Sequence, residues 1–123
     1  MATSILVKNS EGKFDFLQHS KTVSVTIAAD ETKTKVIDVS GFKDLAIMMP
    51  AEWTTATLSL EGSDVVDGTF VDVYDIEGNK VSIAAAASRI IPTLNIIAPL
   101  QYIKLVSSAT QSAARDLKIF LSN

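Results

Sequence analysis

The sequence has no cysteine and a single histidine, His19, among its 123 residues. Without cysteine the chain cannot form disulfides, thiolate metal sites or a cysteine nucleophile, and one histidine excludes the multi-histidine centres that usually bind zinc. His19 lies in a polar stretch, residues 18–21, where we expect a solvated side chain. No Gly-x-Ser-x-Gly motif marks a nucleophilic serine. We therefore expect a protein that is not an enzyme, with no catalytic residue, no metal ligand and no cofactor.

Basic residues are also scarce, since 11 Lys and Arg stand against 14 Asp and Glu, for a net charge of −3. Nucleic-acid binding requires clustered positive charge that replaces counterions on the phosphates, so nucleic acid is not an expected partner. The amino terminus lacks the basic start and apolar stretch of a secretory signal, and we expect a complete chain made in the cytoplasm. The charge-poor residues 81–106 contain Arg89, Pro92 and Pro99, which argues against a membrane-spanning helix.

The sequence is rich in β-branched residues, because Val, Ile and Thr account for 34 of the 123 positions. These residues favour strands, and alternation of apolar and polar positions marks strands with one buried face. The pattern predicts an all-β protein of eight to ten short strands, arranged as an antiparallel β-sandwich that is jelly-roll-like. The expected strands cover residues 22–28, 35–39, 45–49, 54–60, 69–75, 80–83, 94–97, 102–107 and 116–121.

Two segments depart from simple alternation. Residues 45–49 are apolar at every position, which predicts a central strand covered on both faces and ended by Pro50. The alanine run at residues 84–87 favours helix but is too short to be stable alone. It predicts either a single helical turn or a bulged strand edge.

The chain shows no linker or repeat after residue 21, so residues 22–123 are expected to form one sandwich domain. Residues 1–21 have a mixed pattern with a turn signal at Glu11 and Gly12. They predict either a small hairpin or an arm that becomes ordered against a partner.

Five carboxylates crowd into residues 64–77: Asp64, Asp67, Asp72, Asp75 and Glu77. Calcium binds roughly six to eight oxygens of this kind, but the spacing lacks the alternating aspartates of an EF-hand loop. Asp-Gly pairs are first of all turn signals. We interpret the cluster as turns and a solvated edge, with a calcium site as the alternative.

The stretch from residue 83 to residue 100 carries a single charge and many closely spaced isoleucines. Some of these side chains must enter the core, but a small domain has limited room inside, so others are expected to face a partner subunit. The sequence does not divide the two groups. The candidate interface residues here are Arg89, Ile90, Ile91, Ile96 and Ile97, and those in the N-terminal segment are Ile5, Phe14 and Phe16.

Several short motifs of residues 40–121 form a pattern that is also found elsewhere. An apolar strand ends in Pro50 and is followed by Trp53, and a turn and two further strands come later. The motifs are Gly62-Ser63-Asp64, Asp67-Gly68-Thr69-Phe70, Tyr102-Ile103-Lys104 and Arg115-Asp116-Leu117. With these motifs the chain resembles small β-sandwich virion proteins of tailed bacteriophages.

This resemblance implies a structural part of the phage particle, made in the host cytoplasm and then located in the virion. The expected function is that of a capsid decoration or cement protein, or a head-fibre component, which stabilises the head by multivalent surface contacts. The expected partners are the major capsid protein or other virion proteins. The resemblance also implies a homo-oligomer, and a trimer is favoured because symmetric shell sites suit symmetric binders.

The middle of the chain also resembles the jelly-roll domains of carbohydrate-binding modules, although Val65 and Val66 interrupt their Gly-Ser-x-Asp-Gly turn. This resemblance implies a different function, adhesion to a sugar-coated host surface. Flat aromatic rings stack on sugars, and the expected ligand residues are Trp53, Asp64, Asp67 and Tyr102. The position of Trp53 separates the two functions, because a tryptophan that closes the end of the core provides no sugar platform, whereas an exposed one beside the carboxylates does.

Overall fold

The computed structural model describes residues 4–8, 14–18, 20–93 and 96–123, with side chains from Ser20 onward within these ranges. These residues form ten strands and no helix, and hence no helix that could cross a membrane. One sheet has two strands and two sheets have four strands each. The strands are β1 (Ser4–Lys8), β2 (Phe14–Gln18), β3 (Ser20–Ile27), β4 (Ile37–Asp38), β5 (Asp44–Met48), β6 (Leu58–Ser63), β7 (Val71–Asp72), β8 (Ile90–Thr93), β9 (Tyr102–Ser107) and β10 (Arg115–Ser122).

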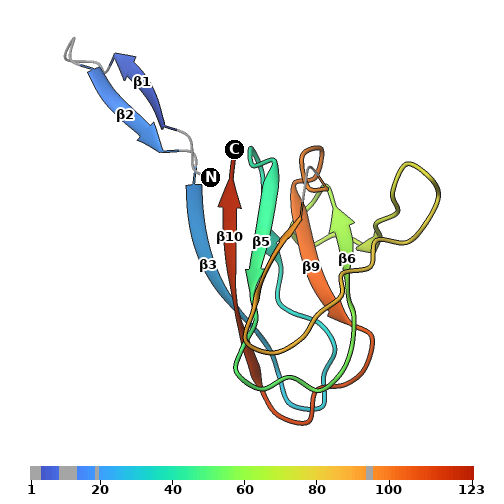
Figure 1. The fold of residues 1–123 in the computed structure, drawn as a ribbon. Helices are drawn as coiled ribbons and strands as arrows, with labels where there is room; N and C mark the ends of the chain where they lie inside the picture. The colour runs from blue at the N-terminus through green and yellow to red at the C-terminus, as the bar shows by residue number, and fades with distance from the viewer. Residues whose placement is uncertain (1–3, 9–13, 19, 94–95) are drawn as a thin grey trace.

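The eight strands from β3 to β10 pair in a nested order (Figure 1). β3 pairs with β10, β4 with β9, β5 with β8 and β6 with β7, all antiparallel. The resulting sheet orders are β3-β10-β5-β8 and β4-β9-β6-β7. A long antiparallel ribbon rolled into two layers gives this order, which is that of a jelly roll. The predicted antiparallel sandwich is therefore confirmed.

The space between the two sheets is filled by the inward-facing residues of alternating strand positions. In β10, Leu117, Ile119 and Leu121 are at most 1% exposed, whereas Asp116 and Lys118, at alternate positions, face solvent. This alternation is the pattern that predicted the strand. The core draws on both sheets and on their connections: Val25, Ile27, Ile37, Val39, Leu45, Ile47, Met49, Leu58, Leu60, Val81, Ile83, Ile97, Ile103, Leu105, Leu117, Ile119 and Leu121.

The strand predicted at residues 54–60 is displaced along the chain. β6 begins at Leu58 and continues through Ser63, beyond the predicted end at residue 60. Gly62 is buried in this strand, and a Cβ there would make ordinary van der Waals contacts with Val73 and Leu100. The glycine therefore lies within a strand and does not mark a turn.

The segment between β6 and β9 contains less strand than the pattern predicts. β7 has two residues, and residues 80–83 form only the isolated bridges Tyr74–Lys80 and Leu58–Ile83. β8 lies at Ile90–Thr93, before the strand predicted at 94–97; residues 94–95 are outside the described residues, and residues 96–97 are not in a strand. Residues 84–87 are not helical, which removes the helical-turn alternative.

The prediction that residues 45–49 are covered on both faces is wrong. β5 is an inner strand of its sheet, and Leu45 and Ile47 are buried in the core. On its outward face, however, Ala46 is only half-buried and Met48 is 39% exposed. An apolar residue thus faces solvent where a sandwich usually presents a polar one.

A group of buried polar side chains, here called the polar clasp, closes one end of the sandwich. Gln111 is completely buried. Its Oε1 accepts from the Thr54 N–H at 2.9 Å and the Arg115 Nε–H at 3.2 Å, and its Nε2 donates to Thr54 O and Ser107 Oγ, both at 3.1 Å. Arg115 also donates to Ser112 Oγ at 3.2 Å. Because buried polar groups must be hydrogen-bonded, the clasp fixes loop 49–57 against loop 108–114.

The first two strands form a hairpin that is separate from the sandwich. β1 and β2 pair only with each other, with Leu6 opposite Phe16 and Lys8 opposite Phe14. In Figure 1 this hairpin extends beyond the end of β3, away from both four-stranded sheets. The predicted turn residues Glu11 and Gly12, and His19, lie outside the described residues.

Candidate functional site

The four residues proposed for sugar binding do not come together. Trp53 lies in the loop between β5 and β6, half-buried against the core, and its Nε1 donates to the carbonyl of Ala56 at 3.2 Å. Asp64 and Asp67 follow the other end of β6, where Tyr102 is paired with the last residue of that strand. The length of β6 thus separates the tryptophan from the two carboxylates and the tyrosine.

The loop that holds Asp64 and Asp67 is built as a turn. The Gly68 N–H donates to the Val65 carbonyl at 3.1 Å, and the Ser63 hydroxyl donates to the same oxygen at 2.8 Å. A Cβ at Gly68 would lie 2.8 Å from a methyl group of Val65, so the loop needs glycine there. The residues the structure describes contain no group of three or more acidic or histidine side chains arranged to hold a metal.

The isoleucines of residues 83–100 divide between the core and the surface. Ile97 is fully buried, so its assignment to an interface is wrong. Ile91 and Ile96 are half-buried against the core. Arg89 and Ile90 are exposed, and Ile90 keeps 56% of its surface accessible.

The interface residues proposed in the N-terminal segment lie on the hairpin. Ile5 is in β1, and Phe14 and Phe16 are in β2. Their side chains are outside the described part of the structure, so the structure gives their strand and register only.

Ile90 belongs to a larger apolar surface on the outward face of the β3-β10-β5-β8 sheet. We call this surface the outward patch. Cross-strand neighbours share a face of a sheet, and the ladders pair Met48 with Ile90, Ala46 with Pro92 and Phe120 with Ala46. One row of the patch, Pro92, Ala46 and Phe120, therefore spans β8, β5 and β10. The other row, Ile90 and Met48, ends at β5, because Lys118 of β10 lies opposite Met48. The members of the patch are Ala46, Met48, Ile90, Pro92 and Phe120.

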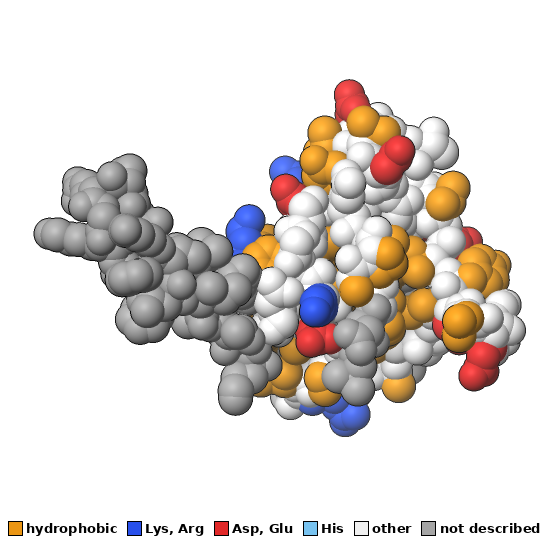
Figure 2. All heavy atoms as spheres, turned by 90° about the horizontal axis from the view of Figure 1, so that it is seen from above, with side chains coloured by type: hydrophobic (Ala, Val, Ile, Leu, Met, Phe, Trp, Pro, Cys, Tyr) orange, Lys and Arg blue, Asp and Glu red, His pale blue; other side chains and the backbone are white. Residues whose placement is uncertain are grey.

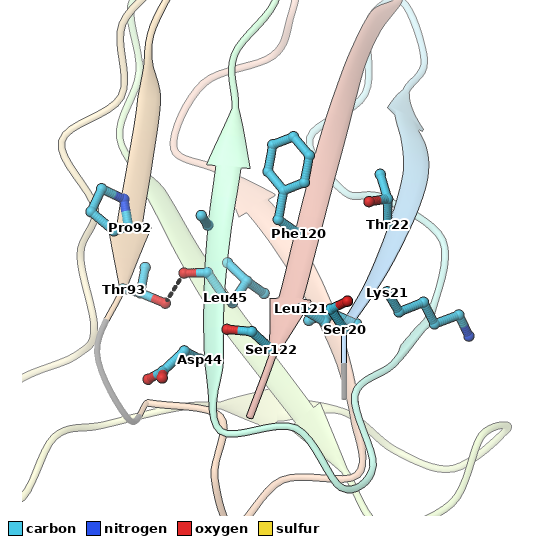
Figure 3. Close-up of a pocket in the computed structure, with 11 residues that line it drawn as sticks. Ser20, Lys21, Thr22, Asp44, Leu45, Pro92, Thr93, Phe120, Leu121 and Ser122 are labelled. Carbon is cyan, nitrogen blue, oxygen red and sulfur yellow. Dashed lines mark hydrogen bonds between the residues drawn. The ribbon is translucent and has the colours of Figure 1, made fainter. Parts of the chain in front are cut away.

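A groove of about 400 Å³ lies at the end of this patch from which the hairpin departs (Figure 3). Figure 3 shows Phe120 standing between Pro92 of β8 and Thr22 of β3. Thr93 donates its hydroxyl hydrogen to the Leu45 carbonyl at 2.8 Å and fixes the β8 side of the groove. Lys21 and other polar residues form the rim, so the groove has an apolar floor and a charged edge.

A second exposed apolar surface, here called the loop surface, surrounds β7. Five of the large hydrophobic side chains that the structure leaves exposed fall within twelve residues of sequence, and three acidic residues lie among them and two directly flank them. In Figure 1 the segment after β7 projects from the right-hand side of the sandwich, and Figure 2 shows orange and red side chains next to each other at that edge. The apolar members are Val65, Val66, Val71, Tyr74 and Ile76, and the acidic members are Asp64, Asp67, Asp72, Asp75 and Glu77.

The tip of the loop surface is a built turn. The Asp75 carboxylate accepts the N–H groups of Glu77 at 3.0 Å and Asn79 at 2.9 Å, and the Asp75 N–H donates to the Asn79 carbonyl. Gly78 has a φ of 88°, a conformation that glycine adopts without strain. This turn holds Ile76 fully exposed to solvent. The acidic cluster thus acts as turn and solvated edge, but the sequence analysis missed the isoleucine that it presents.

The electrostatics of the loop surface are dominated by negative charge. Residues 64–77 contain no basic residue, and Lys80, which follows them, has its Nζ 3.5 Å from the Asp72 carboxylate. The other carboxylates of the segment are exposed. A partner would therefore meet an apolar tip surrounded by negative charges. The acidic spacing in the sequence was the signal that could have indicated this surface.

The comparisons with known proteins give one finding about the fold. No protein-family model matches the chain, and no curated protein matches it. Among solved structures, the chain is similar to the crystal structure of the SPBc2 prophage-derived protein YomS, with a TM-score of 0.54 and 13% sequence identity. The match covers 83% of this chain and 93% of that one. At this identity the likeness shows a shared fold, and it shows that a prophage-derived protein has that fold.

Proposed function

We propose that the chain is a non-enzymatic structural protein of a phage particle that binds the assembled head as a decoration or cement protein. Its fold is shared with a prophage-derived protein, and its motifs resemble those of small virion proteins. Fold alone does not assign function, because β-sandwiches serve many functions. The assignment to particle binding therefore depends on a surface feature.

The observation that carries the proposal is the ordered, fully exposed Ile76 at the tip of the acidic loop surface. Contiguous exposed apolar side chains with a polar rim are typical of protein-binding sites. The surrounding carboxylates favour a partner whose apolar socket is lined by Lys or Arg, since complementary charge steers association. In this proposal the socket belongs to the major capsid protein or another virion protein.

Binding to a shell suits a protein with a modest contact surface. Copies placed on a symmetric lattice, or joined to each other, act together, so weak individual contacts give strong overall attachment. A protein that binds the assembled shell and not its free subunits stabilises the shell by mass action. No covalent chemistry is required for this function.

The alternative, a carbohydrate-binding module, gains little from the observed positions. Trp53, the aromatic residue best suited to stack on a sugar, is half-buried against the core, and its Nε1–H donates to the Ala56 carbonyl. The alternative is therefore kept as an outcome of the test.

The test is co-sedimentation of the full chain with purified heads of the phage that encodes it, at increasing salt concentration. We expect binding that weakens as salt screens the acidic rim, and an affinity about tenfold lower for Ile76→Asp, because central apolar anchors dominate interfaces. Thr110→Asp adds the same charge at an exposed site of loop 108–114 and should bind as the unmodified chain does.

Three outcomes would contradict the proposal. They are absence of binding to the heads, equal binding by the two variants, and retention on immobilised glycans without binding to heads. The last of these would favour the carbohydrate-binding alternative.

A further inference from the structure

We propose that the chain associates with further copies of itself, with the N-terminal hairpin (β1 and β2) of one copy seated on the outward patch and groove of the next. The occupant of the groove is thus a second copy of this chain. This inference does not depend on the proposed binding to phage heads.

The first argument is the polarity of the outward patch. The outward face of an antiparallel sheet in a sandwich is normally polar, and the outward residues of β6 in the other sheet, Ser59, Glu61 and Ser63, follow this rule. The outward patch instead presents an apolar pair, Met48 and Ile90, beside an apolar row of Ala46, Pro92 and Phe120, with Lys118 at its border opposite Met48. An exposed apolar face of this kind is expected to be covered.

The second argument is the composition of the hairpin. Six of the ten residues in β1 and β2 are large and apolar: Ile5, Leu6, Val7, Phe14, Phe16 and Leu17. A two-stranded sheet has no second layer of its own and is marginally stable in water when isolated. The hairpin therefore needs an apolar surface, and the outward patch needs a cover.

The third argument is that a chain cannot seat its own hairpin in its own groove. Residues 20–22 line the groove, and a single residue separates Gln18, the end of β2, from Ser20, the start of β3. Reversal of a strand takes a turn of about two residues or more. In agreement with this, Figure 1 shows the hairpin directed away from the sandwich. A hairpin that seats on an outward patch must therefore come from another copy.

Because the hairpin and the groove are different surfaces, the contact is either exchanged reciprocally between two copies or repeated around a ring. A ring of three is the assembly that the sequence resemblance favours. Both arrangements bury the same two surfaces, so the same substitutions test them.

The test is sedimentation-velocity analysis of the full chain from about 1 to 100 μM, with circular dichroism to confirm that each variant is folded. We expect a concentration-dependent dimer or trimer for the unmodified chain. Ile90→Asp should raise the dissociation constant at least about tenfold. Thr110→Asp is its matched control, since Thr110 is also an exposed β-branched residue, outside both the outward patch and the loop surface, and it should assemble normally. Met48→Lys is the second patch variant, used if Ile90→Asp does not fold.

A variant in the hairpin is also needed, because the outward patches of two copies could contact each other directly, without the hairpin. Phe16→Ser should weaken assembly as strongly as the patch variants do. A chain that is monomeric at 100 μM, equal effects of Ile90→Asp and Thr110→Asp, or normal assembly of Phe16→Ser would each overturn the inference. If the chain is monomeric but still binds phage heads, the self-association alone is overturned. If it forms oligomers but does not bind heads, the proposed function alone is overturned.

Discussion

The two sheets of the sandwich have similar inward faces and different outward faces. Inward, both carry fully buried aliphatic residues, such as Ile47 and Ile119 in one sheet and Leu60 and Leu105 in the other. Outward, the β4-β9-β6-β7 sheet carries polar residues with specific contacts. The Nζ of Lys33 is 3.0 Å from Glu61, and the Nζ of Lys104 is 4.5 Å from the centre of the Phe70 ring. The outward face of β3-β10-β5-β8 carries the outward patch.

This difference separates what the fold requires from what a partner requires. The jelly roll needs an apolar inner layer in both sheets, and it places no demand on the outer layers beyond solubility. One outer layer meets that demand with charges and hydroxyl groups. The other departs from it, so its apolar residues are best explained by contact with another molecule.

The largest expected effect comes from two neighbouring residues of β5 that face opposite ways. Ile47→Ala removes a fully buried side chain and should lower the free energy of unfolding by about 3.5 kcal/mol. Met48→Ala changes a residue of the outward patch and should lower it by about 0.5 kcal/mol or less. Urea denaturation of the two variants measures both values. A large loss for Met48→Ala would mean that the outward patch belongs to the folding core, and the contrast between the two faces would fail.

Polar residues give the second contrast, between the buried polar clasp and the polar outward face. Gln111→Leu leaves the Thr54 N–H and the Arg115 guanidinium without their buried acceptor, and should cost about 2 kcal/mol of unfolding free energy. Ser59→Ala, on the outward face of β6, is the control and should cost about 0.5 kcal/mol or less. The same denaturation experiment measures both. Equal costs would show that Gln111 is not a structural link between the loops.

The strands with strict alternation were predicted well from the sequence. β3 and β10 begin and end within two residues of the predicted bounds, and β9 has the predicted bounds, because buried residues alternate with more exposed ones along each of them. The pattern failed at β5, where apolar residues on both faces were taken as evidence of cover on both sides. Sequence hydrophobicity does not say whether a neighbouring layer belongs to the same chain or to another one.

The candidate sites were harder to predict than the strands. Ile90 and Ile97 have the same side chain in the same apolar stretch, yet one is exposed and the other is fully buried. Their difference comes from the path of the chain from β8 to β9, which local periodicity does not encode. Gln111 and Ile76 were missed because their burial contradicts the usual preference of their residue types: the glutamine is buried and the isoleucine is exposed.

A smaller effect is expected at the ion pair of the polar outward face. Lys33 Nζ lies 3.0 Å from Glu61 Oε2, with the lysine half-exposed and the glutamate mostly covered. A double-mutant cycle with Lys33→Ala and Glu61→Ala should give a coupling energy of about 0.5 kcal/mol, measured by denaturation and reduced in about 1 M salt. A coupling energy near zero would show that these two side chains contribute to stability through packing and not through their charge pairing.

The smallest expected effect is at Asp38, on the edge strand β4. The Ser40 N–H donates to the Asp38 carboxylate at 3.0 Å, and this bond, the Ser40 hydroxyl and the charge of Lys21 lower the pKa of Asp38 below its ordinary value of 3.8. A carboxyl whose pKa is lower in the folded state stabilises the protein above its unfolded pKa, and this stabilisation is lost as the pH falls through the folded pKa. The stability difference between the unmodified chain and Asp38→Asn should therefore be constant near neutral pH, decrease as the pH falls below about 4, and disappear once the pH is below the lowered pKa of the folded state. Ser40→Ala removes the hydroxyl and keeps the backbone bond, so it should retain part of this dependence. Denaturation at several pH values measures the difference, and a gap that widens in acid would reverse the assigned direction.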